Sequence, residues 1–315
     1  MTRQPLVSGI IIFLNAEAYI EEAIASVFAQ TYSQWELLLV DDGSTDRSTH
    51  IAQEYAQKYP DKIRYLEHKG HQNLGMSATR NLGIREARGQ YLALLDADDI
   101  WLPEKLERQV EVLESNPNVG IVFGPTQYWY SWSGQESDHN RDILRPIGVP
   151  ADKIYQPPDL LIRMLKNEAN APATCSILIR RSLLTEIGGF EDAFRGLFED
   201  RAFFTKVYLK IPALVMADFY DRYRQHSDSA CYVEQRSGKY KPMQYSEPHF
   251  RYLKWVEAYL IEQNVDNRHV WQALKIGLLP YQNLSLHYLY QIQRYIKLGI
   301  SKVISLFTRE NIFML

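Results

Sequence analysis

The sequence predicts an α/β fold in which a mostly parallel sheet is flanked by helices and followed by an α-helical C-terminal appendage. In the first hundred residues, short apolar runs alternate with segments whose apolar residues recur at helical spacing, which is typical of parallel strands covered on both faces. From about residue 247, apolar residues recur at helical spacing alone. We therefore place a sheet-containing domain at residues 1–232 and a helical extension at residues 233–315.

Each element of the first domain follows from a local pattern. Apolar and β-branched runs predict strands at residues 7–14, 35–44, 62–68 and 91–96. The segments between them predict helices at residues 16–30, 44–59 and 73–89. The second of these helices has Ser44, Thr45 or Asp46 as its cap, and Gly89 ends the third.

The middle of the chain is less regular. Residues 119–134 predict an edge strand with many aromatic side chains. Residues 171–210 predict a strand, a short helix, a turn at Gly188 and Gly189, and a second helix that begins near Glu199 and Asp200.

Composition excludes several classes of protein. The 35 basic and 38 acidic residues nearly balance, so no overall positive field favours nucleic acid. Two cysteines allow neither a disulfide framework nor a four-cysteine zinc site. The first apolar run meets Asn15 and Glu17 too early for a signal peptide, and no run reaches the roughly 18 apolar residues of a membrane span. We expect a cytoplasmic protein.

Carboxylates follow two of the predicted strands. Asp41 and Asp42 come after one, and Asp96 and Asp98 after another. Ligands of parallel sheets gather at the carboxyl ends of strands, and alternate residues of an extended segment point the same way. Asp96 and Asp98 could therefore hold a divalent cation beside a diphosphate. The alternative is that such acids cap helices or form turns, which accounts well for Asp99.

A series of motifs resembles family 2 glycosyltransferases, which have the GT-A fold. The motifs run in order from about residue 6 to residue 232: SGIIIFLNAEAYIEEAIASVFAQTY, WELLLVDDGSTD, NLGMSATRNLGI, GQYLALLDADDIWLPEKLE, GGFEDAF, LFEDRAFF and YRQHSDSA. The resemblance implies an inverting transferase that takes a sugar from a nucleotide diphosphate donor with Mn or Mg. It also implies a saccharide or lipid-linked acceptor in polysaccharide or glycoconjugate biosynthesis.

The resemblance assigns roles to individual residues. On the nucleotide side it implies contacts from Asn15, Asp41, Asp42, Asn73, Arg80 and Asp96. Asp98, with Asp96, corresponds to the metal-binding D-x-D pair. Asp200 corresponds to the general base and Glu199 to its neighbour, while Arg224, His226 and Ser229 belong to a loop that closes over the diphosphate.

The chain departs from the family at one position that bears on the donor. Leu14 stands where an aromatic residue commonly stacks on the base, and the neighbouring Phe13 should point to the other face of its strand. A carboxylate at Asp42 suits the N3–H donor of uracil, so we expect a UDP-sugar. For the acceptor we expect contacts from residues 125–170. The aromatic residues Tyr128, Trp129 and Trp132 suit sugar faces there, or they serve as packing.

Two other functional classes are alternatives. A nucleotidyltransferase also uses a parallel sheet and paired aspartates, but FLNAEAYIEEA has neither the glycine nor the lysine of its usual loop. An inactive sugar-binding relative would not be expected to keep the D-x-D, ED and YRQHSDS motifs together.

The end of the chain carries a further amphipathic pattern. Within residues 290–315, the side chains of Ile292, Ile296 and Ile300 share one helical face, and Arg294 and Lys297 lie elsewhere. This pattern predicts a helix that lies on a membrane surface, such as the inner face of the membrane, or one that packs on the catalytic domain.

Overall fold

The computed structural model describes residues 4–236 and 246–283. The chain divides into two compact units, Met1–Ala230 and Cys231–Leu315. The first contains the sheets and the second is helical over its described residues. The α/β class predicted from the sequence is confirmed.

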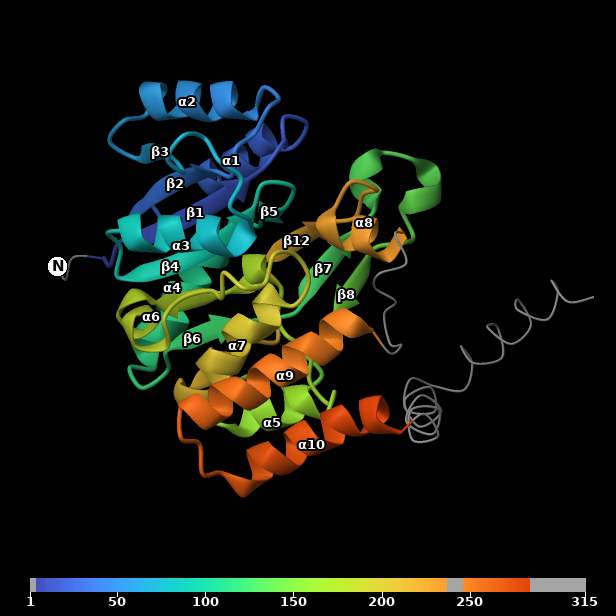
Figure 1. Ribbon diagram of the computed structural model, residues 1–315. Coiled ribbons are helices and arrows are strands. Elements are labelled where there is room, and N and C mark those ends of the chain that lie inside the picture. The colour runs from blue at the N-terminus through green and yellow to red at the C-terminus, as the bar shows by residue number, and fades with distance from the viewer. Residues whose placement is uncertain (1–3, 237–245, 284–315) are drawn as a thin grey trace, which may run out of the picture. The chain divides into compact units, whose positions relative to one another are not determined.

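The first unit is built on an eight-stranded sheet of order β3-β2-β1-β4-β10-β6-β11-β9 (Figure 1). Its first four strands are parallel to one another: β1 (Val7–Phe13), β2 (Trp35–Asp41), β3 (Ile63–Glu67) and β4 (Tyr91–Asp96). The others are β6 (Ile121–Phe123), β9 (Lys153–Tyr155), β10 (Leu178–Arg180) and β11 (Ala213–Val215). The register places Phe13 opposite Asp41 and Ile12 opposite Asp96, so both acidic strand ends flank the end of β1.

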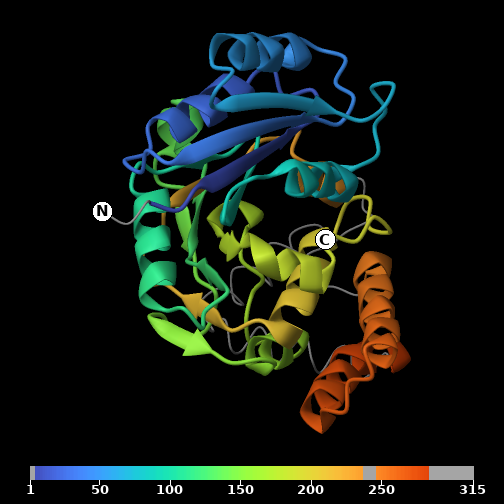
Figure 2. The same ribbon diagram turned by 90° about the vertical axis from the view of Figure 1, so that its left-hand side faces the viewer.

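Helices cover both faces of the parallel strands, which explains their continuous apolar sequence. On one face, Ile11 and Leu39 share a core with Ile24 and Ile51 of α1 (Ile20–Phe28) and α2 (Ser48–Lys58), and α4 (Lys105–Ser115) adds to it. On the other face lies α3 (Met76–Glu86), where a Cβ added at Gly83 would meet Ile10 and Val40. Accordingly, α2 and α3 lie on opposite sides of these strands (Figure 2).

The first unit contains three further helices in addition to those that cover the parallel strands. They are α5 (Asp159–Leu165), α6 (Arg181–Ile187) and α7 (Glu199–Lys210). As predicted, Glu199 and Asp200 occupy the first turn of α7.

A second, four-stranded sheet has the order β5-β12-β7-β8. It contains β5 (Ile100–Trp101), β7 (Thr126–Trp129), β8 (Ile143–Arg145) and β12 (Asp221–Arg224). The single edge strand expected at residues 119–134 is wrong. Gly124 and Pro125 divide it into β6, which lies between β10 and β11, and β7, which lies between β12 and β8. The backbone at Gly124 passes so close to Asp218 that an added Cβ would lie 2.3 Å from its carbonyl oxygen.

The second unit contains α9 (Glu247–Glu262) and α10 (Arg268–Gln282), and α8 (Ala230–Arg236) leads into it. Buried Val256 and Leu260 of α9 and Val270 and Leu274 of α10 recur at helical spacing, which confirms the helical composition expected from residue 247. Within the described part of the chain, no helix is both long and apolar enough to cross a membrane. The amphipathic segment at residues 290–315 lies outside the described residues.

Candidate active site

The two aspartates of the D-x-D pair have different partners. Oδ1 of Asp96 accepts a hydrogen bond from Arg80 at 2.7 Å, and Oδ2 accepts one from Thr174 at 3.1 Å. Oδ2 of Asp98 lies 3.0 Å from Nε2 of His226, and the Asp98 side chain keeps 25% of its surface exposed. Asp96 is therefore held on both oxygens, while Asp98 is bonded through one, and the two side chains are equally exposed.

Arg80 of α3 joins the end of β4 to the start of α7. Its buried guanidinium pairs with Asp96 and, at 3.4 Å, with Oε1 of Glu199. Although burial lowers it, the two neighbouring carboxylates hold the pKa of Arg80 above its ordinary value. This ion pair brings two of the predicted acidic motifs, D-x-D and ED, into one cluster.

The acids of α7 lie in a strongly desolvated place. Burial and the charge of Asp200 raise the pKa of Glu199 to about 7, against the opposing effect of Arg80. Burial also raises the pKa of Asp200, opposed by Arg201. Oδ1 of Asp200 accepts the backbone N–H of Arg201 at 2.7 Å. A carboxylate whose pKa is raised holds a proton more readily, which suits a group that must accept one.

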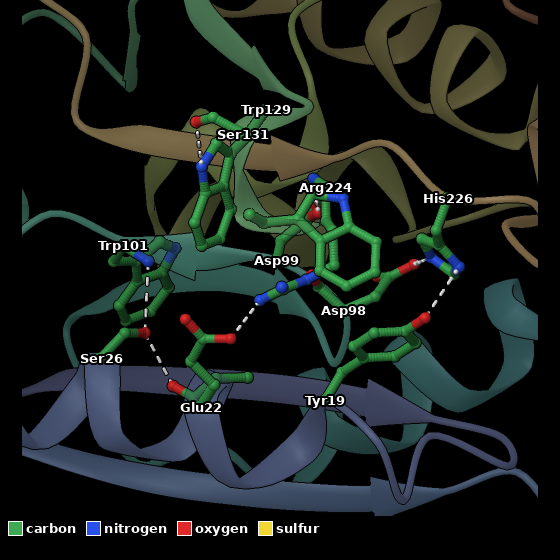
Figure 3. Close-up of polar contacts among 12 residues, drawn as sticks. Tyr19, Glu22, Ser26, Asp98, Asp99, Trp101, Trp129, Ser131, Arg224 and His226 are labelled. Atoms are coloured by element: carbon green, nitrogen blue, oxygen red, sulfur yellow. Dashed lines mark hydrogen bonds and ion pairs between the residues drawn. The ribbon is translucent and has the colours of Figure 1, made fainter. Parts of the chain in front are cut away.

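Arg224, at the end of β12, is locked to the turn that follows β4. Its backbone N–H donates to Oδ1 of Asp99 at 2.9 Å, and its Nε donates to the carbonyl oxygen of Asp98 at 2.6 Å. Its Nη2 pairs with Glu22 of α1 (Figure 3). Asp99 is buried, and burial together with the charges of Asp98 and Asp96 raises its pKa well above the ordinary value. Asp99, which the sequence assigned to a turn, thus also fastens β12 to the turn after β4.

Three aromatic rings surround the Arg224 guanidinium. Its Cζ lies 5.1 Å from the ring centre of Tyr19, 4.6 Å from that of Trp129 and 5.0 Å from that of Trp132. Trp129 and Trp132, considered above as sugar platforms, therefore pack around this cation. Tyr128 instead packs edge-on against Tyr223, with ring centres 5.1 Å apart.

Asp41, the last residue of β2, and Asp42, which follows it, have different partners. Asp42 accepts backbone N–H groups from Leu74 at 2.8 Å and Gly75 at 3.0 Å, just before α3. Asp41 has no exposed surface, and accepts from the backbone of Ser44 and the hydroxyl groups of Thr49 and Tyr65. Asp41 therefore supports the turn after β2, and Asp42 fixes the backbone just before α3.

Other predicted residues surround the end of β1. Asn15, with φ of 52°, accepts the backbone N–H of Thr45 at 2.7 Å through Oδ1. The backbone of exposed Asn73 packs on Gly43, where an added Cβ would lie 2.9 Å from its nitrogen. Phe13, the last residue of β1, is buried, and Leu14, just beyond the strand, is 45% exposed.

Sequence reasoning missed Tyr19, Glu22 and Thr174. Tyr19 contacts His226, Glu22 pairs with Arg224, and Thr174 holds Asp96. A signal existed for Tyr19, because it lies four residues after Asn15 in the turn at the carboxyl end of a parallel strand.

The donor atoms in this site fit a hard divalent cation. Asp98 offers a partly exposed carboxylate beside Asp96, and Mg or Mn commonly takes one or two carboxylates together with substrate phosphates. Among the described residues, no group of three or more histidine, cysteine or acidic side chains is arranged for a metal ion. The residues present therefore suit a cation that shares its ligands with a phosphate-bearing substrate.

Comparison with known proteins gives a family and a fold. Residues 8–188, more than half of the chain, match the family described as Glycosyl transferase family 2. A putative teichuronic acid biosynthesis glycosyltransferase, TuaG of Bacillus subtilis, is 35% identical over 50% of this chain and 55% of its own length. EpsE of the same organism, a putative glycosyltransferase, is 38% identical over 39% of this chain and 43% of its own length. The chain thus spans about half the length of these relatives.

Solved structures show the same architecture. TarS of S. aureus, in complex with UDP-GlcNAc, superposes with a TM-score of 0.62 at 20% identity, over 87% of this chain and 71% of that one. The mannosyltransferase PcManGT of Pyrobaculum calidifontis, in complex with GDP-Man and Mn²⁺, gives a TM-score of 0.53 at 18% identity, over 95% and 82%. At these identities the likeness concerns the fold, and it confirms the GT-A type expected from the sequence.

Proposed function

The chain belongs to glycosyl transferase family 2, and on that premise we propose that it moves a sugar from a nucleotide diphosphate donor to a saccharide or glycolipid acceptor, with inversion. One observation carries most of the proposal: Arg80 joins Asp96 of the D-x-D pair to Glu199 of the ED pair. The residues that would face the diphosphate and the residues that would deprotonate the acceptor therefore share one site.

We assign the donor as a UDP-sugar. Asp42 supports this choice, because its carboxylate is an acceptor and uracil presents an N3–H donor. The fold relatives are bound to UDP-GlcNAc in one case and to GDP-Man in the other, so both bases occur within this architecture. With exposed Leu14 in place of an aromatic ring, recognition of the base depends on hydrogen bonding more than on stacking.

In the mechanism that we propose, the acceptor hydroxyl attacks C1 of the sugar from the face opposite the diphosphate. The new C1–O bond forms while the bond to the diphosphate breaks, and the diphosphate keeps the electron pair. Asp200 takes the acceptor proton. Asp98 and His226 face the departing diphosphate. Arg80 holds the carboxylates of Asp96 and Glu199 in place through its two ion pairs. Mg or Mn, when bound at Asp98 and Asp96, would neutralise charge on the diphosphate.

The resemblance also suggests where this reaction takes place. TuaG is named for teichuronic acid biosynthesis, and we infer that this chain likewise acts in polysaccharide or glycoconjugate biosynthesis. We place it in the cytoplasm at the inner face of the membrane. The amphipathic pattern of residues 290–315 supports contact with that surface.

A panel of nucleotide sugars tests the function. With Mn present, the protein should release nucleotide diphosphate from a UDP-sugar, and Asp98→Ala should weaken donor binding and its metal dependence because one hard ligand is lost. Calorimetry of donor binding with and without Mn measures both effects. Unchanged metal dependence in Asp98→Ala contradicts the metal assignment. Turnover of a nucleoside triphosphate with a sugar phosphate, in place of a nucleotide sugar, contradicts the function.

A further inference from the structure

A tyrosine just before α1 contacts the histidine that faces Asp98. Oη of Tyr19 lies 3.3 Å from Nδ1 of His226, and Nε2 of the same ring lies 3.0 Å from Oδ2 of Asp98. In Figure 3 the imidazole contacts the carboxylate through one ring nitrogen and the phenol through the other. They come from the turn after β1, the segment after β12 and the turn after β4. A line of hydrogen bonds thus joins three strand ends.

With a neutral imidazole, the chemistry of the partners sets the direction of both bonds. An ionised carboxylate can only accept, so Nε2 of His226 carries the proton that is shared with Asp98. In a neutral imidazole, Nδ1 is then an acceptor, and the Tyr19 hydroxyl donates to it. Both ring nitrogens are used, and a flipped or rotated ring would lose both contacts.

Ring packing holds the same orientation. The centres of the Tyr19 and His226 rings lie 4.7 Å apart, and Trp132 stands edge-on to both, at 5.8 Å from Tyr19 and 6.4 Å from His226. The His226 side chain is only 7% exposed. Little space remains for another rotamer.

The support beneath Tyr19 is itself well fixed. The backbone N–H of Tyr19 donates to the carbonyl oxygen of Ala16 at 2.9 Å, and the N–H of Ala16 donates to Oγ of Ser48 at 2.8 Å. The turn after β1 is thereby tied to the start of α2. Tyr19 stands on a rigid support, which a positioning group requires.

We propose that Tyr19 is a positioning residue: its hydroxyl and ring hold the imidazole of His226 so that the Asp98 carboxylate keeps its orientation toward the donor diphosphate. This inference rests on the proposed function, because it assigns Asp98 to the donor. In this role Tyr19 acts through its contact with His226.

Turnover of Tyr19→Phe tests the proposal, because this variant keeps the ring and removes the hydroxyl group. Its kcat for the donor should fall by about 2- to 10-fold, as expected for losing one hydrogen bond between uncharged groups, with thermal stability near wild type. In a His226→Ala background, Tyr19→Phe should cause no further loss of kcat, because the imidazole that the Tyr19 hydroxyl contacts is absent. An equal loss in both backgrounds, or an unchanged kcat in Tyr19→Phe, overturns the proposal.

A second measurement does not depend on turnover. In protein labelled with ¹⁵N-histidine, the Nδ1 resonance of His226 should move in Tyr19→Phe. It should stay in place in the control Tyr32→Phe, which loses a tyrosine hydroxyl bonded to the carbonyl oxygen of Pro5. An unmoved Nδ1 resonance in Tyr19→Phe overturns the positioning. If the wild type turns over no nucleotide sugar, the proposed function fails, and this resonance still decides whether Tyr19 holds His226.

Discussion

Glu199 and Asp200 are neighbours of the same charge, yet their side chains have different partners. Glu199 is buried and pairs with Arg80, whereas Asp200 accepts a backbone N–H from Arg201 and is half-buried. A base must exchange its proton with a substrate, and a carboxylate that is committed to a buried arginine is poorly suited to this. At the scale of single residues, we therefore expect Asp200 to act in chemistry and Glu199 to hold the site together.

Replacing Asp200 by Asn tests its chemical role. The amide keeps the shape of the side chain but cannot accept the proton, so turnover should fall by roughly 10²–10⁴, while the donor dissociation constant changes little. Steady-state kinetics together with donor titration separate the two effects. Near-normal transfer by folded Asp200→Asn, with only the small loss of stability expected for a charge removed from the first turn of α7, would point to Glu199 instead.

The titration of Glu199 predicts how stability depends on pH. Its pKa of about 7 in the folded chain stands above the ordinary 4.5, so the folded chain binds more protons here between these values. The contribution of Glu199 to the free energy of unfolding is therefore fully present below pH 4.5 and is lost as pH rises through about 7.

Glu199→Gln should remove that loss. Between pH 4.5 and about 7, the free energy of unfolding of the wild type should fall with rising pH. That of Glu199→Gln, measured by urea denaturation, should fall less, by on the order of 1–3 kcal/mol. Parallel pH profiles for the two proteins would show that Glu199 titrates normally. Asp192→Asn, an exposed carboxylate in the loop before α7, serves as the control and should leave the profile unchanged.

At the scale of elements, α3 connects the parts of the site. The two N–H groups before it bond to Asp42, and Arg80 in its middle pairs with the two acidic motifs. Asn81, one residue on, donates to the carbonyl oxygen of Phe190 and accepts its N–H. The position of α3 on the sheet therefore sets the spacing between Asp42 and α7.

That position depends on a glycine at the contact with β1. A Cβ at Gly83 would lie 2.5 Å from Cγ2 of Ile10 and 3.2 Å from Cγ2 of Val40, so Gly83→Ala must push α3 away from the sheet. We expect the free energy of unfolding to fall by about 1–3 kcal/mol, the usual effect of overpacking, and donor turnover to fall with it. Urea denaturation measures the first. Arg85→Ala, at an exposed position of the same helix, should change neither.

The sequence predicted the elements and strand ends well because both depend on local patterns. Apolar runs and alternation located β1, β2 and β4, and with them the acids at their ends. The pairing of those acids was beyond such reasoning: Asp98 and His226 are 128 residues apart, and only the fold brings them together. Residues 119–134 were misjudged for a related reason, since strand order depends on distant partners rather than on the aromatic residues of the strand itself.

At the scale of the whole molecule, the two compact units allow separate tasks. The residues assigned to the site all lie in the first unit, and the amphipathic pattern of residues 290–315 belongs to the second. We therefore expect chemistry and membrane contact to be separable.

Ending the chain after residue 283 tests this separation. The shortened protein should hydrolyse its donor like the full chain but should no longer sediment with vesicles that contain anionic lipid, because the apolar face and its lysines are lost. Co-sedimentation and donor hydrolysis are measured on the same preparations. Loss of folding on truncation would show that the segment packs against the rest of the protein, and retained vesicle binding would place the contact elsewhere.

The bonds from Leu74 and Gly75 to Asp42 bear on attempts to redesign the donor. A carboxylate that already fixes the chain before α3 cannot be exchanged freely for a group that suits another base. Asn in its place would turn one acceptor oxygen into a donor that faces backbone N–H groups. In the role proposed for Asp42, base preference and the start of α3 depend on the same side chain, and altered donor variants are better sought at exposed Leu14 and Asn73, whose side chains can change without loosening that helix.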